Sequence, residues 1–251
     1  MSNSDHTLDL AHLWPHVRQY NSDISKILGK SCPHPTYPLH VSWPLGHPFG
    51  DRCNEMMAQL ILQIEQTLLA EMDAKGVKGD IVEFGIYRGY TLEKLIEKAE
   101  ELKMDRNIYG FDSFEGLSEP STKHDFENWY KGQFSAGYDE VAALLKLKDR
   151  PRLKLIKGWV NESLVSPEAK AIKKVAYARI DVDIYEPSRD CLDFLSTRLA
   201  DGAILVFDDW TYTSEKGETK AFMDWCAKVP HLRFEWLGQC NWRFYLRVHH
   251  R

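Results

Sequence analysis

From residue 80 onward, short apolar runs alternate with segments of helical periodicity, and this alternation restricts the possible folds more than any other feature of the chain. It predicts an α/β fold, a doubly wound sheet with helices on both faces, because parallel strands need a crossover segment between them. Two final runs predict an antiparallel hairpin at one edge of the sheet. The predicted strands are 80–85, 107–112, 152–158, 175–183 and 203–209, the helices 90–103, about 188–199 and about 217–228, and the hairpin 233–238 with 242–248.

Residues 1–79 follow different patterns and are predicted to form an N-terminal arm and a helix that pack on the domain formed by 80–251. The stretch 32–50 holds five prolines, which favour an extended loop. This arm is expected to pack on its own domain or on a neighbouring subunit of a homodimer, or else to form part of a substrate pocket. A helix within 51–79 is predicted by apolar residues at 56, 57, 60, 61, 64, 68, 69 and 72.

Composition excludes several classes of protein. The 251 residues are 43% hydrophobic and carry a net charge of −5 without a long basic run, so a nucleic-acid partner is not expected. No apolar stretch reaches the ~20 residues that cross a bilayer, and the first residues lack a secretion signal. The five cysteines form no CxxC pair, which indicates reduced thiols and a cytoplasmic location.

Residues suited to ligand binding follow the predicted strands. Ligands of open parallel sheets bind beyond the carboxyl ends of the strands. Gly85 and Gly89 form a GxxxG that is neither a dinucleotide fingerprint nor a P-loop, so a pyrophosphate cradle is not expected. Asp112 is suited to accept hydrogen bonds from ribose hydroxyls, or alternatively to cap a turn or helix. Trp159 is suited to lie against adenine, or alternatively to pack in the core.

Four acids end two adjacent predicted strands: Asp181 and Asp183, then Asp208 and Asp209. On a strand, residues i and i+2 share a face, and neighbouring strands lie ~4.8 Å apart, so the four carboxylates are expected to gather. Such a group must be protonated, ion-paired or neutralised by a cation. Hard oxygen ligands favour Mg²⁺, Mn²⁺ or Ca²⁺ over zinc. In the alternative interpretation, two acids cap helices and the others pair with Arg179 or Lys220.

Five segments occur in a distinctive order: VEFGIYRG, GFDSFEGL, LKLIKGWVNESL, RIDVDIYEPSRDCLDFLSTRLADGAILVFDDW and GETKAFMDW. Over roughly residues 80–228 the chain resembles the macrocin O-methyltransferase family, most specifically in 179–210. The resemblance implies a class I methyltransferase-like sheet and S-adenosylmethionine-dependent methylation of sugar hydroxyls. Val182 departs from the family pattern, which has glycine between the two acids.

The resemblance also implies roles for individual residues. Asp181, Asp208 and Asp209 match magnesium ligands, and Asp183 matches the general base. The expected cofactor-binding residues are Glu83, Gly85, Gly89, Asp112, Ser113, Gly158, Trp159 and Asp181.

The predicted function is therefore metal-dependent O-methylation of a small molecule with vicinal oxygens, such as a sugar or natural product. The segment 118–140 is predicted to be a mobile lid, or alternatively an ordinary surface loop. A nucleotide-sugar glycosyltransferase that holds its metal with Asp181 and Asp183 is the rival enzyme. A non-catalytic protein that kept the fold is the third interpretation.

Overall fold

The computed structural model describes residue 26 and residues 48–211, 213–240 and 242–251. For residues 48–57 it describes the backbone only. Apart from residue 26, the predicted N-terminal arm up to residue 47 lies outside this description. The strands are β1 (Asp80–Phe84), β2 (Ile108–Asp112), β3 (Leu153–Lys157), β4 (Val175–Ile180), β5 (Leu199–Phe207), β6 (Leu232–Cys240) and β7 (Arg243–His250). The helices are α2 (Pro48–Ala74), α3 (Tyr90–Glu101), α4 (Tyr138–Leu144), α5 (Val160–Ser163), α6 (Pro167–Ala171), α7 (Tyr185–Leu195) and α8 (Gly217–Cys226), with a 3₁₀ turn at Leu147–Asp149.

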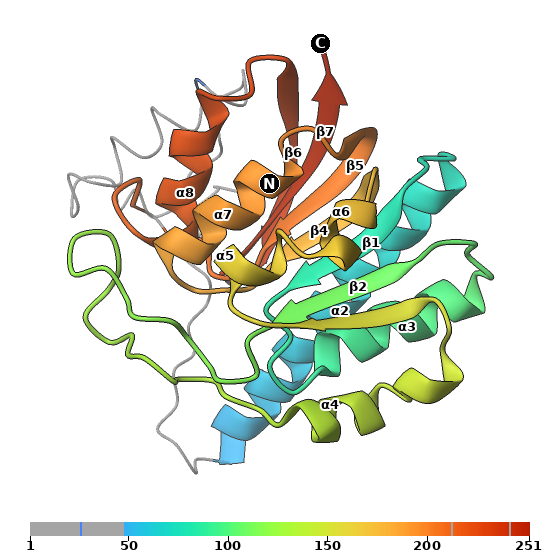
Figure 1. Ribbon diagram of the computed structural model, residues 1–251, viewed down its shortest axis with the longest axis horizontal. Coiled ribbons are helices and arrows are strands. Elements are labelled where there is room, and N and C mark those ends of the chain that lie inside the picture. The colour runs from blue at the N-terminus through green and yellow to red at the C-terminus, as the bar shows by residue number, and fades with distance from the viewer. Residues whose placement is uncertain (1–25, 27–47, 212, 241) are drawn as a thin grey trace, which may run out of the picture.

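The strands form one seven-stranded sheet in the order β3-β2-β1-β4-β5-β7-β6 (Figure 1). The first five are parallel, and β7 and β6 add an antiparallel hairpin. This arrangement confirms the predicted parallel sheet with an antiparallel edge. The strand order reverses between β1 and β4, which is the point where doubly wound sheets bind ligands.

Helices cover both faces of the sheet. The helices α2 and α3 lie on one face, and α5, α6, α7 and α8 lie on the other (Figure 1). In α2, Leu69 and Met72 are fully buried, but Leu60, predicted in the same apolar stripe, is 45% exposed. Its place in the core was therefore wrongly predicted. Among the described helices, none has the length and apolar composition that crossing a bilayer requires.

The strand β4 ends at Ile180, three residues earlier than predicted. Asp183 has φ 61°, in the left-handed region that non-glycine residues rarely occupy. The prediction that Asp181 and Asp183 share one face of a strand is therefore wrong, because the backbone turns between them. Ile180 is paired with Phe207 of β5, so the residues that follow the two strand ends still meet.

The predicted lid, 118–140, leaves the sheet after β2 and includes the start of α4. It is attached to the rest of the molecule near its centre. The carboxylate of Asp125, 2% exposed, accepts a hydrogen bond from the backbone N–H of Tyr185 at 2.7 Å. The Gly217 N–H donates to the His124 carbonyl at 2.8 Å, and Lys216 Nζ donates to the Asp125 carbonyl at 2.8 Å. Any movement of the lid therefore has a fixed point at 124–125.

Candidate active site

A cavity of about 780 Å³ opens at the carboxyl ends of β1, β2, β4 and β5. The side next to β1 and β2 is lined by Gly85, Tyr87, Asp112, Ser113 and Trp159. The side next to β4 and β5 is lined by Asp181, Asp183, Asp208, Asp209 and Arg243. Trp129, Lys131 and Phe134 of the predicted lid complete part of the wall. The cavity thus joins the two groups of residues that the sequence singled out.

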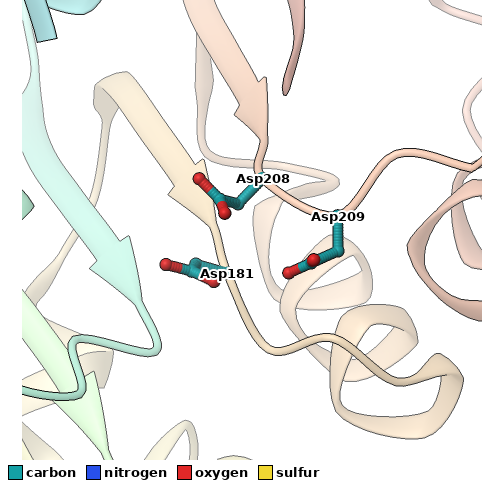
Figure 2. A group of neighbouring side chains, drawn as sticks. All are labelled: Asp181, Asp208 and Asp209. Atoms are coloured by element: carbon teal, nitrogen blue, oxygen red, sulfur yellow. The ribbon is translucent and has the colours of Figure 1, made fainter. Parts of the chain in front are cut away.

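The four acids, hereafter the acidic cluster (Asp181, Asp183, Asp208 and Asp209), lie where the paired strands β4 and β5 end. Asp181 continues from β4 with its N–H bonded to the Phe84 carbonyl, and the Asp208 N–H is bonded to the Ile180 carbonyl. Asp181, Asp208 and Asp209 each place a carboxylate oxygen within 4.8 Å of the others. Figure 2 shows these three carboxylates turned toward a common space. Their roles as ligands stay a prediction.

Two arginines partly compensate the acidic cluster. Arg179, 2% exposed, donates to Asp181 Oδ2 at 2.5 Å and also binds Asp208. Arg243 Nε donates to Asp208 Oδ1 at 2.8 Å. The pairing with Arg179 that the alternative interpretation predicted is therefore present, whereas Lys220 pairs with Asp224 instead.

The negative charge nevertheless exceeds the positive charge at this site. Beneath the cavity, Arg179 also contacts Glu65 of α2 at 3.4 Å and Glu83 of β1 at 3.1 Å. Among the described residues, neither Asp183 nor Asp209 is ion-paired with a basic side chain. Arg179 and Arg243 thus pair with four acids, Glu65, Glu83, Asp181 and Asp208. Three more acids, Asp183, Asp209 and Glu218, lie beside them without a basic partner among the described residues.

Burial and the neighbouring carboxylates change the protonation of Asp183 and Asp209. Burial, followed by the nearby charges of Asp181 and Glu218, raises the pKa of Asp183 to about 8. Burial and the carboxylates of Asp183 and Asp208 raise the pKa of Asp209 well above its ordinary value. Without a cation, the cluster therefore holds protons at neutral pH, because like charges this close are unfavourable in a partly dry site.

The turn after β1 brings the chain unusually close to the acidic cluster. Gly85 has φ 79°, and a Cβ there would lie 1.7 Å from the Asp181 carbonyl oxygen, so only glycine fits. Asp112 holds the turn: its Oδ2 accepts from the N–H groups of Ile86 and Tyr87 at 2.8 and 2.9 Å, and its Oδ1 accepts from Phe114 at 2.6 Å. The predicted turn-capping role of Asp112 is therefore present. A carboxylate has about four acceptor sites, which leaves one for a ligand.

The other residues predicted to bind the cofactor fall into two groups. Ser113 and the half-buried Trp159 line the cavity beside Asp112. Glu83, Gly89 and Gly158 do not line it, so their predicted direct contact is not seen. Glu83 is 1% exposed and accepts from Arg179, Gly89 precedes the first residue of α3, and Gly158 precedes Trp159. Any effect of Glu83 on a ligand is therefore transmitted through Arg179.

Several residues at the site were not predicted from sequence. Arg243 reaches the acidic cluster from the predicted hairpin, and Asp125 and Glu218 bind backbone N–H groups of distant segments. Only Glu65 had a visible sequence signal. It lies four residues from Ile61 and from Leu69, and an acid at the centre of an apolar helical stripe indicates a buried charge with a partner.

The site suits the two groups that the sequence predicted. Three carboxylates that converge without histidine or cysteine are a donor set typical of a hard divalent cation, and the uncompensated charge favours one. The adjoining part of the cavity offers one remaining acceptor site on Asp112 and the ring of Trp159, which are groups suited to bind a nucleoside. A cation and an organic ligand would thus lie in one continuous cavity.

Comparison with known proteins places these features in a family. A family model described as macrocin-O-methyltransferase (TylF) matches residues 49–228. The 8-demethyl-8-(2,3-dimethoxy-alpha-L-rhamnosyl)-tetracenomycin-C 4'-O-methyltransferase of Streptomyces olivaceus is 31% identical over an alignment of 178 residues that covers 66% of this chain and 66% of that protein. The chain spans about half the length of two other curated relatives, 53 and 56%.

Solved structures share the fold. The O-methyltransferase NovP has a TM-score of 0.61 at 21% identity, covering 76% of this chain and 79% of that one. Two structures of CalS11, described as a calicheamicin methyltransferase and as a TDP-rhamnose 3'-O-methyltransferase, have TM-scores of 0.56 and 0.55 at 23% identity. The matches to these two structures extend over 93 and 92% of this chain and over 93% of each CalS11 chain. The predicted class I methyltransferase fold is confirmed.

Proposed function

The chain belongs to the macrocin-O-methyltransferase family, and on that premise we propose that it transfers a methyl group from S-adenosylmethionine to a hydroxyl of a sugar or sugar-bearing natural product. A divalent cation held by Asp181, Asp208 and Asp209 assists the transfer. The observation that carries this proposal is the convergence of these three carboxylates, within 4.8 Å of one another, beside Asp183 in the same cavity as Asp112 and Gly85.

Asp183 is the proposed general base. Asp183 is 9% exposed and lines the cavity, and its raised pKa makes the ionised form a stronger proton acceptor than an ordinary carboxylate. Asp183 would take the proton of the acceptor hydroxyl as the oxygen forms its bond to the methyl carbon and the carbon–sulfur bond breaks.

Asp181, Asp208 and Asp209 would hold the cation. Arg179 keeps Asp181 and Asp208 in place from beneath the cavity, and Arg243 binds Asp208 from the cavity wall. When bound there, a hard divalent cation supplies positive charge that makes a nearby hydroxyl easier to deprotonate. The cofactor supplies a methyl group that its sulfonium already makes electrophilic. The contribution of the chain is therefore alignment and proton removal rather than activation of the methyl group.

The cofactor is proposed to lie over the turn after β1. There Gly85 lets the ligand approach the backbone, Asp112 offers its remaining acceptor site to a ribose hydroxyl, and Trp159 lies against the adenine. Trp129, Lys131 and Phe134 would cover the bound ligands and exclude water if the predicted lid closes.

The acceptor is proposed to carry a deoxysugar. Both the tetracenomycin methyltransferase and CalS11 are named for rhamnose-containing substrates. The rival glycosyltransferase is not favoured, because that reaction would use Asp181 and Asp183 and leave Asp208 and Asp209 without a role.

The test is methyl transfer from isotopically labelled S-adenosylmethionine to a panel that contains methyl α-L-rhamnoside, TDP-rhamnose and a rhamnosylated tetracenomycin. Labelled product should form with Mg²⁺ and disappear with excess EDTA. A thermal-shift series with S-adenosylmethionine and UDP-sugars runs in parallel, because a bound ligand raises the unfolding temperature. Stabilisation by UDP-sugars alone, or full transfer in EDTA, would contradict the proposal.

A further inference from the structure

One side chain joins the two turns that carry the acidic cluster. Glu218 lies in the first turn of α8 and is 0% exposed. Its Oε1 accepts a hydrogen bond from the N–H of Val182, and its Oε2 accepts one from the N–H of Asp209, each at 3.1 Å. Val182 lies between Asp181 and Asp183. Glu218 therefore uses its two oxygens on two different acidic turns.

These two N–H groups lie where the sheet no longer provides partners. The N–H groups of Asp181 and Asp208 still bind carbonyls of β1 and β4, and the next N–H in each turn binds Glu218. Buried N–H groups without an acceptor are costly, so the chain needs an acceptor at this position. The start of α8 is held close enough to provide one. A Cβ at Gly217 would lie only 3.1 Å from the Asp183 carbonyl oxygen.

We propose that Glu218 is a positioning residue that fixes the separation between the Asp181–Asp183 turn and the Asp208–Asp209 turn. The two oxygens of one carboxylate have a fixed spacing, so neither turn moves without the loss of a hydrogen bond. This inference rests on the proposed function in one respect: a cation that bridges both turns would lose affinity when their separation is no longer fixed.

A role limited to stabilising α8 is distinguishable from this one. An acid in the first turn of a helix interacts favourably with the helix dipole wherever its oxygens point. In Glu218 both oxygens are bound to segments outside α8. A helix-stabilising role would affect overall stability and every ligand of the cavity equally, whereas a positioning role affects the cation most.

The variant Glu218→Gln keeps the size of the side chain and replaces one acceptor oxygen with an NH₂ group, which cannot accept from an N–H. Glu215→Gln is the matched control, because it makes the same chemical change three residues earlier at an exposed position. Calorimetric titration with Mn²⁺ alone should give roughly 10- to 100-fold weaker binding for Glu218→Gln, the range seen when groups that orient metal ligands are removed. Glu215→Gln should bind Mn²⁺ as the wild type does. Binding of S-adenosylhomocysteine should be unchanged in both variants.

Amide hydrogen exchange tests the two hydrogen bonds of Glu218 without a metal. In the wild type, the N–H groups of Val182 and Asp209 should exchange slowly, although they lie in turns. In Glu218→Gln, at least one should exchange roughly tenfold faster, which is the upper end of the loss expected for one ordinary buried hydrogen bond. Fast exchange of both in the wild type would overturn the inference, and this measurement does not depend on the variant folding.

Equal Mn²⁺ affinity of Glu218→Gln and Glu215→Gln would also overturn it. Equal weakening of Mn²⁺ and S-adenosylhomocysteine binding would overturn it in favour of a general structural role. A wild type that binds no Mn²⁺ would refute the proposed metal site, and the exchange rates alone would then decide whether Glu218 fixes the two turns.

Discussion

Binding of Mg²⁺ is expected to release protons, and Asp183 supplies a defined part of them. With the pKa of Asp183 at about 8, about nine tenths of these side chains are protonated at pH 7 and about one tenth at pH 9. A cation at the neighbouring carboxylates favours the ionised form and lowers this pKa. Binding should therefore release up to about 0.9 proton from Asp183 at pH 7 and up to about 0.1 at pH 9. The release falls as pH rises, because the free site has already lost its proton.

Isothermal titration in two buffers of different ionisation enthalpy measures the number of protons released. The variant Asp183→Asn should lose at least the part assigned to Asp183, because its neutral amide also removes a charge that raises the pKa of Asp209. Asp190→Asn is the control: Asp190 lines the same cavity but is paired with Arg189. Wild-type binding without proton release at pH 7, or equal release from Asp183→Asn and the wild type, would refute the reasoning.

Three further outcomes are expected. Asp208→Ala should weaken Mg²⁺ binding roughly 10- to 100-fold and abolish metal-stimulated transfer, while calorimetry shows intact binding of S-adenosylhomocysteine; loss of both would argue against a ligand role. Gly85→Ala should lower the free energy of unfolding in urea by roughly 3 kcal/mol or more, because its Cβ would meet the Asp181 carbonyl at 1.7 Å. Gly76→Ala, also at positive φ but with open space around it, should cost only about 1–2 kcal/mol, and equal losses would show that backbone conformation alone matters. Asp125→Ala should cost about 1–2 kcal/mol and speed proteolysis within 126–137; an unchanged cleavage rate would mean that Asp125 does not hold the lid.

The centre of the sheet was predictable because β1, β2, β4 and β5 contain apolar runs that must be buried. The end of β4 was not. The residues Ile180 to Ile184 alternate apolar and acidic side chains, which is also the pattern of a continuing strand. Beyond Ile180 the Val182 N–H binds Glu218 instead of a neighbouring strand, and Glu218 lies 36 residues further along the chain. Periodicity carries no information about such a distant acceptor.

The convergence of the acidic cluster was predictable for a related reason. Parallel strands that end in register bring the residues after them together, whatever those residues are. Which carboxylates pair with an arginine depends on side chains from other strands. Nothing in the sequence around Arg243 indicated that this hairpin residue pairs with Asp208. Asp125 and Glu218 were missed for another reason: each binds a backbone N–H, and a backbone group leaves no trace in the sequence of its partner.

Ion pairing and a cation are compatible explanations for the four acids, although the sequence presented them as alternatives. Arg179 and Arg243 compensate Asp181 and Asp208, yet Arg179 is shared with Glu65 and Glu83 below the cavity. Asp183 and Asp209 have no basic partner among the described side chains. Their excess charge can be balanced only by protons or by a cation, and the two compete for the same oxygens. The arginines therefore hold Asp181 and Asp208, and the uncompensated Asp183 and Asp209 line the cavity, where an acceptor hydroxyl would bind.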